Sequence, residues 1–166
     1  DVVMVGSWAA QIEAIQADGL TLIEMNGRST SHPLAITDNP HSVAPVDVAL
    51  VLVKSYQTQT AVSRIHPLLS PNGLVITLQN GIGNAEILQE GLKSAFVTVG
   101  VTSMGATMVE PGVVRHAGDG PIHLAPSAAG HKHFLPMVDL LRQAGFAAEV
   151  ADDVDSLVWG KLAINT

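Results

Sequence analysis

Gly73-Leu-Val-Ile-Thr-Leu-Gln-Asn-Gly-Ile-Gly-Asn84 is the stretch that decides the fold of this chain. Its run of apolar or β-branched residues, Leu74–Leu78, is typical of a strand covered on both faces, as in a parallel sheet. The pair Asn80-Gly81 then predicts a turn, and Gly83 lets the backbone approach another group closely. Ligands of open α/β sheets bind outside the carboxyl ends of the strands, so Asn80 is a candidate binding residue. A plain strand-to-helix turn is the alternative interpretation.

The chain up to this stretch alternates strands with helices, apart from one β-hairpin around Asn26-Gly27-Arg28. The second helix is expected to turn Val62, Ile65 and Leu69 inward, and Ser70–Gly73 is expected to form a turn. The predicted elements are, in order, strand Asp1–Val5, helix Ala9–Ala17, hairpin strands Gly19–Glu24 and Ser31–Thr37, strand Asp47–Val53, helix Tyr56–Leu69, strand Leu74–Leu78 and helix Asn84–Leu92. This order predicts an α/β fold with a Rossmann-type, doubly wound, mostly parallel sheet.

The pattern changes after Phe96, where short strands follow one another without helices and predict an antiparallel extension of the sheet. The final helix is expected to be capped by Asp152 or Asp153. The helix before it should bury Leu135, Val138 and Leu141. The predicted elements are strands Phe96–Val101, Thr107–Val109, Val113–His116 and Ile122–Ala125, helix His133–Ala144, strand Ala147–Val150 and helix Asp152–Asn165.

Composition narrows the class of protein. The 166 residues are 47% hydrophobic and 14% charged, which is typical of a globular domain with a core. A formal charge of -7 argues against nucleic acid or an anionic membrane as the main partner. There is no cysteine, and no apolar run is long enough to span a bilayer, so a cytoplasmic protein is expected.

Two places carry candidate binding chemistry. Lys54 and Asn80 end successive buried strands, so parallel strands would bring both to one crevice. Lys161 and Asn165 are four residues apart on the last helix and share a face. Solvated polar residues are the competing interpretation of both pairs. No Gly-x-Gly-x-x-Gly fingerprint is present, and the spacing of the histidines does not predict a metal site.

Nearly the whole chain resembles the ketopantoate reductase family, through an ordered set of motifs. They are Leu52-Val-Lys54, Leu78-Gln-Asn-Gly-Ile-Gly-Asn84, Gly100-Val-Thr-Ser-Met-Gly-Ala106, Pro111-Gly112 with Gly118, and Trp159-Gly-Lys-Leu-Ala-Ile-Asn165. The resemblance implies NADPH-dependent reduction of 2-dehydropantoate to D-pantoate, on the route to pantothenate and coenzyme A.

The resemblance also implies roles for residues at matching positions. Lys161 would be the catalytic general acid. Asn80 and Asn165 would contact substrate, and Asn80 would also contact the cofactor. Lys54 would line the same cleft, beside both ligands. Ala106 would meet the cofactor through its backbone.

The chain departs from the family pattern in three respects. Residues 1–150 are expected to form an NAD(P)-binding domain without its first β-α unit. Residues 151–166 are expected to begin a helix that links it to a missing helical domain. Ser7, which by the resemblance would contact the cofactor, stands where the family often carries arginine. No arginine grips a 2′-phosphate there and no carboxylate repels it, so NAD stays open, while NADP is kept on family grounds.

Two other functions stay open. The chain could belong to an NAD(H)-dependent reductase of another 2-oxo acid, as in D-mandelate-type relatives, or to a nucleotide-binding module without catalysis. The expected partner is a small 2-oxo acid, and a homodimer is left open.

Overall fold

The computed structural model describes residues 1–126, 129–153, 156 and 158–161. The chain divides into two compact units, which are described separately. The first consists of Asp1–Ala44 and Ser103–Gly120, and the second of Pro45–Thr102 and the residues from Pro121 onward. Each unit is therefore assembled from segments that are separated in the sequence.

The first unit contains two small sheets and one helix. A parallel pair, β1-β4, lies beside a four-stranded sheet of order β3-β2-β9-β8. Helix α1 is tied to both sheets by side-chain amides, because Gln16 Nε2 donates to the Ile36 carbonyl O at 3.1 Å and Gln11 Oε1 accepts from the Gly112 N–H at 2.8 Å. The elements are β1 Val3–Val5, α1 Ala9–Asp18, β2 Leu20–Ile23, β3 Ser29–His32, β4 Ala35–Thr37, 3-10 helix η1 Pro40–Ser42, β8 Gly105–Glu110 and β9 Val113–Gly118.

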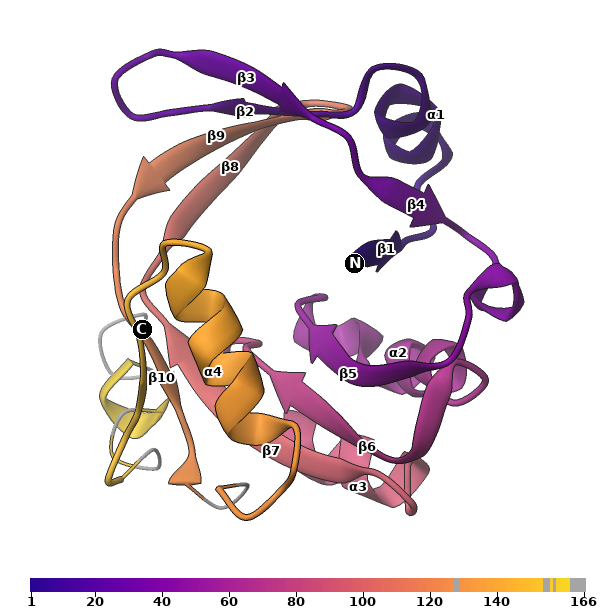
Figure 1. The fold of residues 1–166 in the computed structure, drawn as a ribbon, viewed down its shortest axis with the longest axis vertical. Coiled ribbons are helices and arrows are strands. Elements are labelled where there is room, and N and C mark those ends of the chain that lie inside the picture. Colours follow the sequence, from indigo (N-terminus) through magenta and orange to yellow (C-terminus); the bar gives the residue numbers. More distant parts are fainter. Residues whose placement is uncertain (127–128, 154–155, 157, 162–166) are drawn as a thin grey trace. The chain divides into compact units, whose positions relative to one another are not determined.

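The second unit is built on a five-stranded sheet of order β11-β10-β7-β6-β5. Strands β5, β6 and β7 are parallel neighbours, and β10 runs antiparallel to β7. Figure 1 shows α4 in front of this sheet and α2 and α3 behind it. The elements are β5 Val46–Val51, 3-10 helix η2 Ser55–Gln57, α2 Thr58–Ile65, β6 Leu69–Thr77, α3 Asn84–Gly91, β7 Phe96–Thr102, β10 Ile122–Leu124, α4 Phe134–Gln143 and β11 Ala148–Val150.

Strand β6 is the centre of the second unit. Leu74, Val75 and Ile76 are completely buried, as expected for a strand with neighbours on both edges and helices on both faces. Val75 packs in one cluster with Val62 of α2 and Leu88 of α3. The predicted α/β fold with a doubly wound, mostly parallel sheet is thus confirmed.

Several predicted boundaries are wrong, each for a local reason. The predicted strand Ser31–Thr37 is interrupted at Pro33, which cannot donate to a ladder, and its two parts join different sheets. Helix α2 ends at Ile65, two residues before Pro67, so Leu69 belongs to β6 instead of the helix. The predicted turn at Ser70–Gly73 appears as an irregularity inside β6, where the register with β5 shifts.

Two further predictions need correction. Leu135 of α4 is exposed, and Phe134 is buried in its place. The antiparallel extension holds for β10, but the β8-β9 hairpin pairs with β2 in the first unit instead. Asp153 Oδ1 accepts a hydrogen bond from the Ser156 N–H at 3.1 Å, which is the bond that the predicted helix cap requires. None of the described helices is long and apolar enough to cross a membrane.

Candidate functional site

The ends of β5 and β6 bring the predicted residues of the second unit to one edge of its sheet. These strands are parallel, with Val51 opposite Thr77, and the Leu78 N–H donates to the Val51 carbonyl O at 3.2 Å. Lys54 follows β5 and Asn80 follows β6, so both lie beyond the carboxyl ends of neighbouring strands. This is the predicted arrangement, and ligands of such sheets bind at this edge.

The turn after β6 is shaped by two glycines. Gly81 and Gly83 have φ angles of 91° and 88°, which the backbone of a residue with a Cβ atom rarely adopts. Nothing lies within 4 Å of the position of a Cβ on Gly83. Asn80 is exposed at the start of this turn, and α3 begins directly after Gly83. The turn therefore leaves open space beside an amide that can both donate and accept hydrogen bonds.

Lys161 lies in the same cavity as Asn80. The cavity has a volume of about 90 Å³ and is lined by Leu78, Gln79, Asn80, Gly81, Val101, Val158 and Lys161. Pockets for drug-sized ligands measure about 300–1,000 Å³, so this cavity has room only for a small chemical group. The apolar part of the lining, from Leu78, Val101 and Val158, thus lies next to the amides of Gln79 and Asn80 and the ammonium group of Lys161.

The Lys161 ammonium group is held and partly desolvated. Its Nζ donates a hydrogen bond to the carbonyl O of Thr102, the last residue of β7. Burial lowers the pKa of Lys161 because the charged form loses hydration. An ammonium group has three N–H donors, so donation to Thr102 leaves others for a ligand in the cavity.

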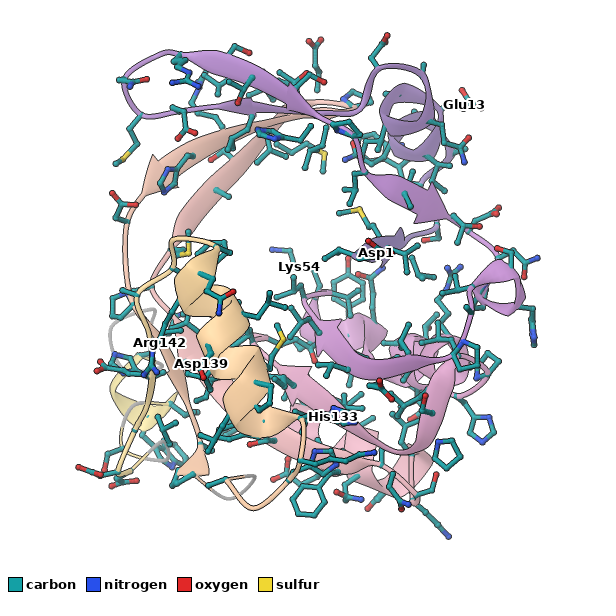
Figure 2. The ribbon with its side chains drawn as sticks, in the orientation of Figure 1. Asp1, Glu13, Lys54, His133, Asp139 and Arg142 are labelled. Carbon is teal, nitrogen blue, oxygen red and sulfur yellow. The ribbon has the colours of Figure 1, made fainter. Side chains whose placement is uncertain are left out.

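Lys54 is exposed and does not line this cavity. It occupies the N-cap of η2 with an extended backbone, and Figure 2 shows its side chain extending from the turn after β5. Asn165, which was predicted to share a helical face with Lys161, lies outside the described residues.

Ser7 and Ala106 belong to the first unit. Ser7 is exposed between β1 and α1, at the carboxyl end of β1. Ala106 is exposed on β8, opposite His116 of β9. The structure thus brings Asn80 and Lys161 together in the second unit, whereas Ser7 and Ala106 belong to the first unit.

A nicotinamide dinucleotide would meet suitable groups at the β5-β6 edge. The exposed Lys54 ammonium matches phosphate or carboxylate oxygens, and the Asn80 amide matches a partner with both donors and acceptors. The open turn at Gly81 and Gly83 leaves room for close approach. Among the described residues, no group of three or more histidine and carboxylate side chains could hold a metal ion.

The sheet topology is that of a Rossmann-type domain, and the cavity at its carboxyl edge is a candidate ligand site. The family model described as "Ketopantoate reductase PanE/ApbA" matches residues 1–129. The chain therefore belongs to the ketopantoate reductase family.

Curated and solved relatives agree with this assignment. The 2-dehydropantoate 2-reductase of Halobacterium salinarum is 32% identical over 165 residues, which cover 99% of this chain and 54% of that protein. The crystal structure of a PanE/ApbA family ketopantoate reductase from Ralstonia eutropha JMP134 superposes with a TM-score of 0.85 at 31% identity, covering 95% of this chain and 51% of that one.

A third relative is a D-mandelate dehydrogenase, solved as a ternary structure with NADH and anilino(oxo)acetate. Its TM-score is 0.87 at 25% identity, covering 99% of this chain and 53% of that one. The chain spans about half the length of the curated relatives it matches.

The sequence did not reveal the polar side chains behind the site. Thr58 and Asn84 are buried next to the strand ends, and Gln79 is turned toward them. The available signals were weak: Asn84 begins one predicted helix, Thr58 lies in the first turn of another, and Gln79 belongs to the predicted turn after the strand Leu74–Leu78. The sequence also did not predict that the Thr102 carbonyl group binds Lys161, because every residue has a backbone carbonyl group and its residue type does not mark it as an acceptor.

Proposed function

We propose that the full-length protein reduces 2-dehydropantoate to D-pantoate with NADPH, a step toward pantothenate and coenzyme A. Family membership supports this proposal. The observation that carries it is the cavity shared by Asn80 and Lys161 at the carboxyl end of β6, where burial lowers the pKa of the lysine. An amide that binds and an ammonium group that releases a proton readily are what reduction of a carbonyl group needs.

The reaction adds one hydride and one proton to the 2-oxo group. A bound reduced nicotinamide supplies the hydride to the carbonyl carbon. Lys161 donates the proton to the carbonyl oxygen, and its hydrogen bond to the Thr102 carbonyl O fixes Nζ for this transfer. Partial burial favours the neutral amine, so proton release costs less than from an exposed lysine.

The remaining residues of the proposed site bind and orient. Asn80 would hydrogen-bond both substrate and cofactor from the turn after β6. Lys54 would attract the substrate carboxylate or a cofactor phosphate, since it is exposed at the end of β5. Asn165 as a substrate contact, and Ser7 and Ala106 as cofactor contacts, are proposed on the resemblance to the family.

The direct test is steady-state oxidation of NADPH, and separately NADH, by the full-length protein with 2-dehydropantoate. We expect turnover with NADPH. Turnover with NADH alone would keep the reaction and overturn the choice of cofactor. Turnover with neither would overturn the proposed substrate.

A second candidate is reduction of an aromatic 2-oxo acid with NADH. It is favoured by the likeness to the D-mandelate dehydrogenase and by Ser7, which offers no guanidinium group to a 2′-phosphate. The 2-oxo acid that corresponds to mandelate, tested with NADH in the same assay, separates the two candidates through the ratio of their kcat/KM values.

A further inference from the structure

A network of hydrogen bonds, buried where Thr58 meets Asn84, joins the two strand ends of the candidate site. Gln79 is at its centre, because Nε2 donates to the Val53 carbonyl O at 2.9 Å and to Thr58 Oγ1 at 2.9 Å. Its Oε1 accepts from Thr77 Oγ1 at 3.0 Å. Both amide hydrogens and the amide oxygen are therefore committed, which fixes the orientation of the Gln79 side chain.

The hydrogen-bond network continues through two nearly inaccessible side chains, Thr58 and Asn84, to the turn that carries Asn80. Thr58 Oγ1 lies 2.9 Å from Asn84 Oδ1 and 2.8 Å from the Ser55 carbonyl O, so its single hydrogen serves these two acceptors. Asn84 Nδ2 donates to the carbonyl O of Asn80 at 3.2 Å. Thr58 is 0% and Asn84 5% exposed, so the hydrogen bond between these two side chains is shielded from competing water.

The bonded backbone groups lie directly at the candidate binding residues. Val53 and Ser55 flank Lys54, and the carbonyl groups of both accept hydrogen bonds of this network. The Asn80 carbonyl group is its last acceptor. One set of side chains thus holds the turn that carries Lys54 and the turn that carries Asn80, although they are far apart in sequence.

We propose that Gln79, Thr58 and Asn84 are positioning residues that hold Lys54 and Asn80 in register for ligand binding. This inference rests on the proposed function. Each of the three side chains acts through backbone groups of the binding turns. Since Thr58 and Asn84 are buried, removing either side chain leaves the polar group of the other without its partner and lets the turns shift.

The test replaces Thr58 in the full-length protein by Val, which has nearly the same shape and no hydroxyl group. We expect kcat/KM for 2-dehydropantoate to fall about tenfold, mainly through KM, as one or two buried hydrogen bonds are lost. Thr58→Ser restores the hydroxyl and should recover most of the loss. Thr98→Val is the matched control, because it removes a similarly buried hydroxyl from the middle of β7 and should leave KM unchanged.

A double-mutant cycle with Asn80→Ala distinguishes positioning from simple destabilisation. If Thr58 acts largely through Asn80, Thr58→Val should have much less effect in the Asn80→Ala background. An undiminished effect there, or an equal loss from Thr98→Val, would overturn the inference. If Thr58→Val does not fold, Asn84→Asp provides the test, because it keeps the acceptor for Thr58 and removes the donor to Asn80.

Cofactor binding gives a readout that does not need turnover. The dissociation constants of NADPH and NADH are measured by fluorescence titration for the wild type, Thr58→Val and Thr58→Ser. Weaker binding by the Val variant that the Ser variant reverses supports positioning even if 2-dehydropantoate is not the substrate. If the Val variant changes neither the dissociation constant of the cofactor nor the KM for 2-dehydropantoate, while the wild type turns over normally, the inference is overturned and the proposed function stays intact. A wild type with neither cofactor binding nor turnover overturns both.

Discussion

Lys161 is the residue on which the proposed chemistry depends most directly. A positioned general acid contributes about 10²–10⁴-fold to a reaction rate, so we expect Lys161→Ala to lower kcat by that factor and to leave the Kd of the cofactor nearly unchanged. Lys93→Ala is the control, because Lys93 is an exposed lysine beyond the end of α3. Turnover of Lys161→Ala within a few-fold of wild type would contradict the role of general acid.

The lowered pKa of Lys161 determines the direction in which kcat/KM should change with pH. Only the protonated lysine can donate, so kcat/KM should fall as pH rises through its pKa, and burial moves this fall below the pH expected for an exposed lysine. The guanidinium group of Lys161→Arg stays protonated throughout, so this variant should lose the alkaline fall whatever its residual rate. An unchanged alkaline limb in Lys161→Arg would assign that limb to another group.

At the residue scale, sequence could locate the strand ends but not the side chains behind them. Lys54 and Asn80 were predicted from the residues that terminate two buried runs, and the structure confirms that they follow neighbouring parallel strands. The inward turn of Gln79 depends on Thr58, 21 positions earlier in the chain. A contact of that kind exists only after the strands and helices have packed.

At the scale of elements, helix α4 shows how far the buried face of a helix can be predicted from the sequence. An α-helix turns by about 100° per residue, so Leu135 and Leu141 point about 120° apart, whereas Phe134, Val138 and Leu141 lie close to one line. The structure buries the second set. The sequence pattern predicts Leu135 in place of Phe134, because both residues are apolar and both lie at helical spacings from Val138 and Leu141.

Alanine substitutions in α4 test this face. Phe134 is completely buried, so Phe134→Ala should lower the free energy of unfolding by about 3–5 kcal/mol. Leu135 is 53% exposed, and Leu135→Ala should change it by less than about 0.5 kcal/mol. Chemical denaturation of both variants provides the measurement, and equal losses would contradict the observed face.

Strand β7 needs a glycine where β10 and the end of β6 come close. A Cβ on Gly100 would lie 2.6 Å from Leu124 Cδ2, 2.6 Å from Leu78 Cδ2 and 3.0 Å from the His123 carbonyl O. Gly100→Ala should therefore destabilise the protein by about 1–3 kcal/mol through overpacking. Gly118→Ala is the control, since nothing lies within 4 Å of its Cβ position, and a thermal melt compares the two.

At the scale of the whole molecule, stability should be distributed unevenly among the sheets. Leu74, Val75 and Ile76 of β6 are fully buried and paired on both sides, whereas β1 and β4 form a pair of three-residue strands. We expect amide hydrogen exchange to be slowest in β6 and fastest in β1 and β4. Comparable protection of these strands would show that the chain unfolds as one cooperative unit.

Sequence predicted the fold class because alternating buried strands and helices dictate a parallel sheet. It did not predict that the β8-β9 hairpin leaves the five-stranded sheet to pair with β2. The residues of β8 and β9 have the composition of ordinary surface strands. Strand β9 pairs in parallel with β2 through residues 92 positions apart, such as Thr21 and Val113, and no local sequence pattern predicts such a pairing.

The discontinuity of the two units has a consequence for synthesis on the ribosome. The first unit needs β9, which ends at Gly118, to pair with β2, and the second needs β10 to pair with β7. Translation proceeds at about 5–20 residues per second, so β2 must wait several seconds for its partner while β5, β6 and β7 emerge. During that interval the nascent chain holds an unpaired strand edge, a natural point of contact for a chaperone.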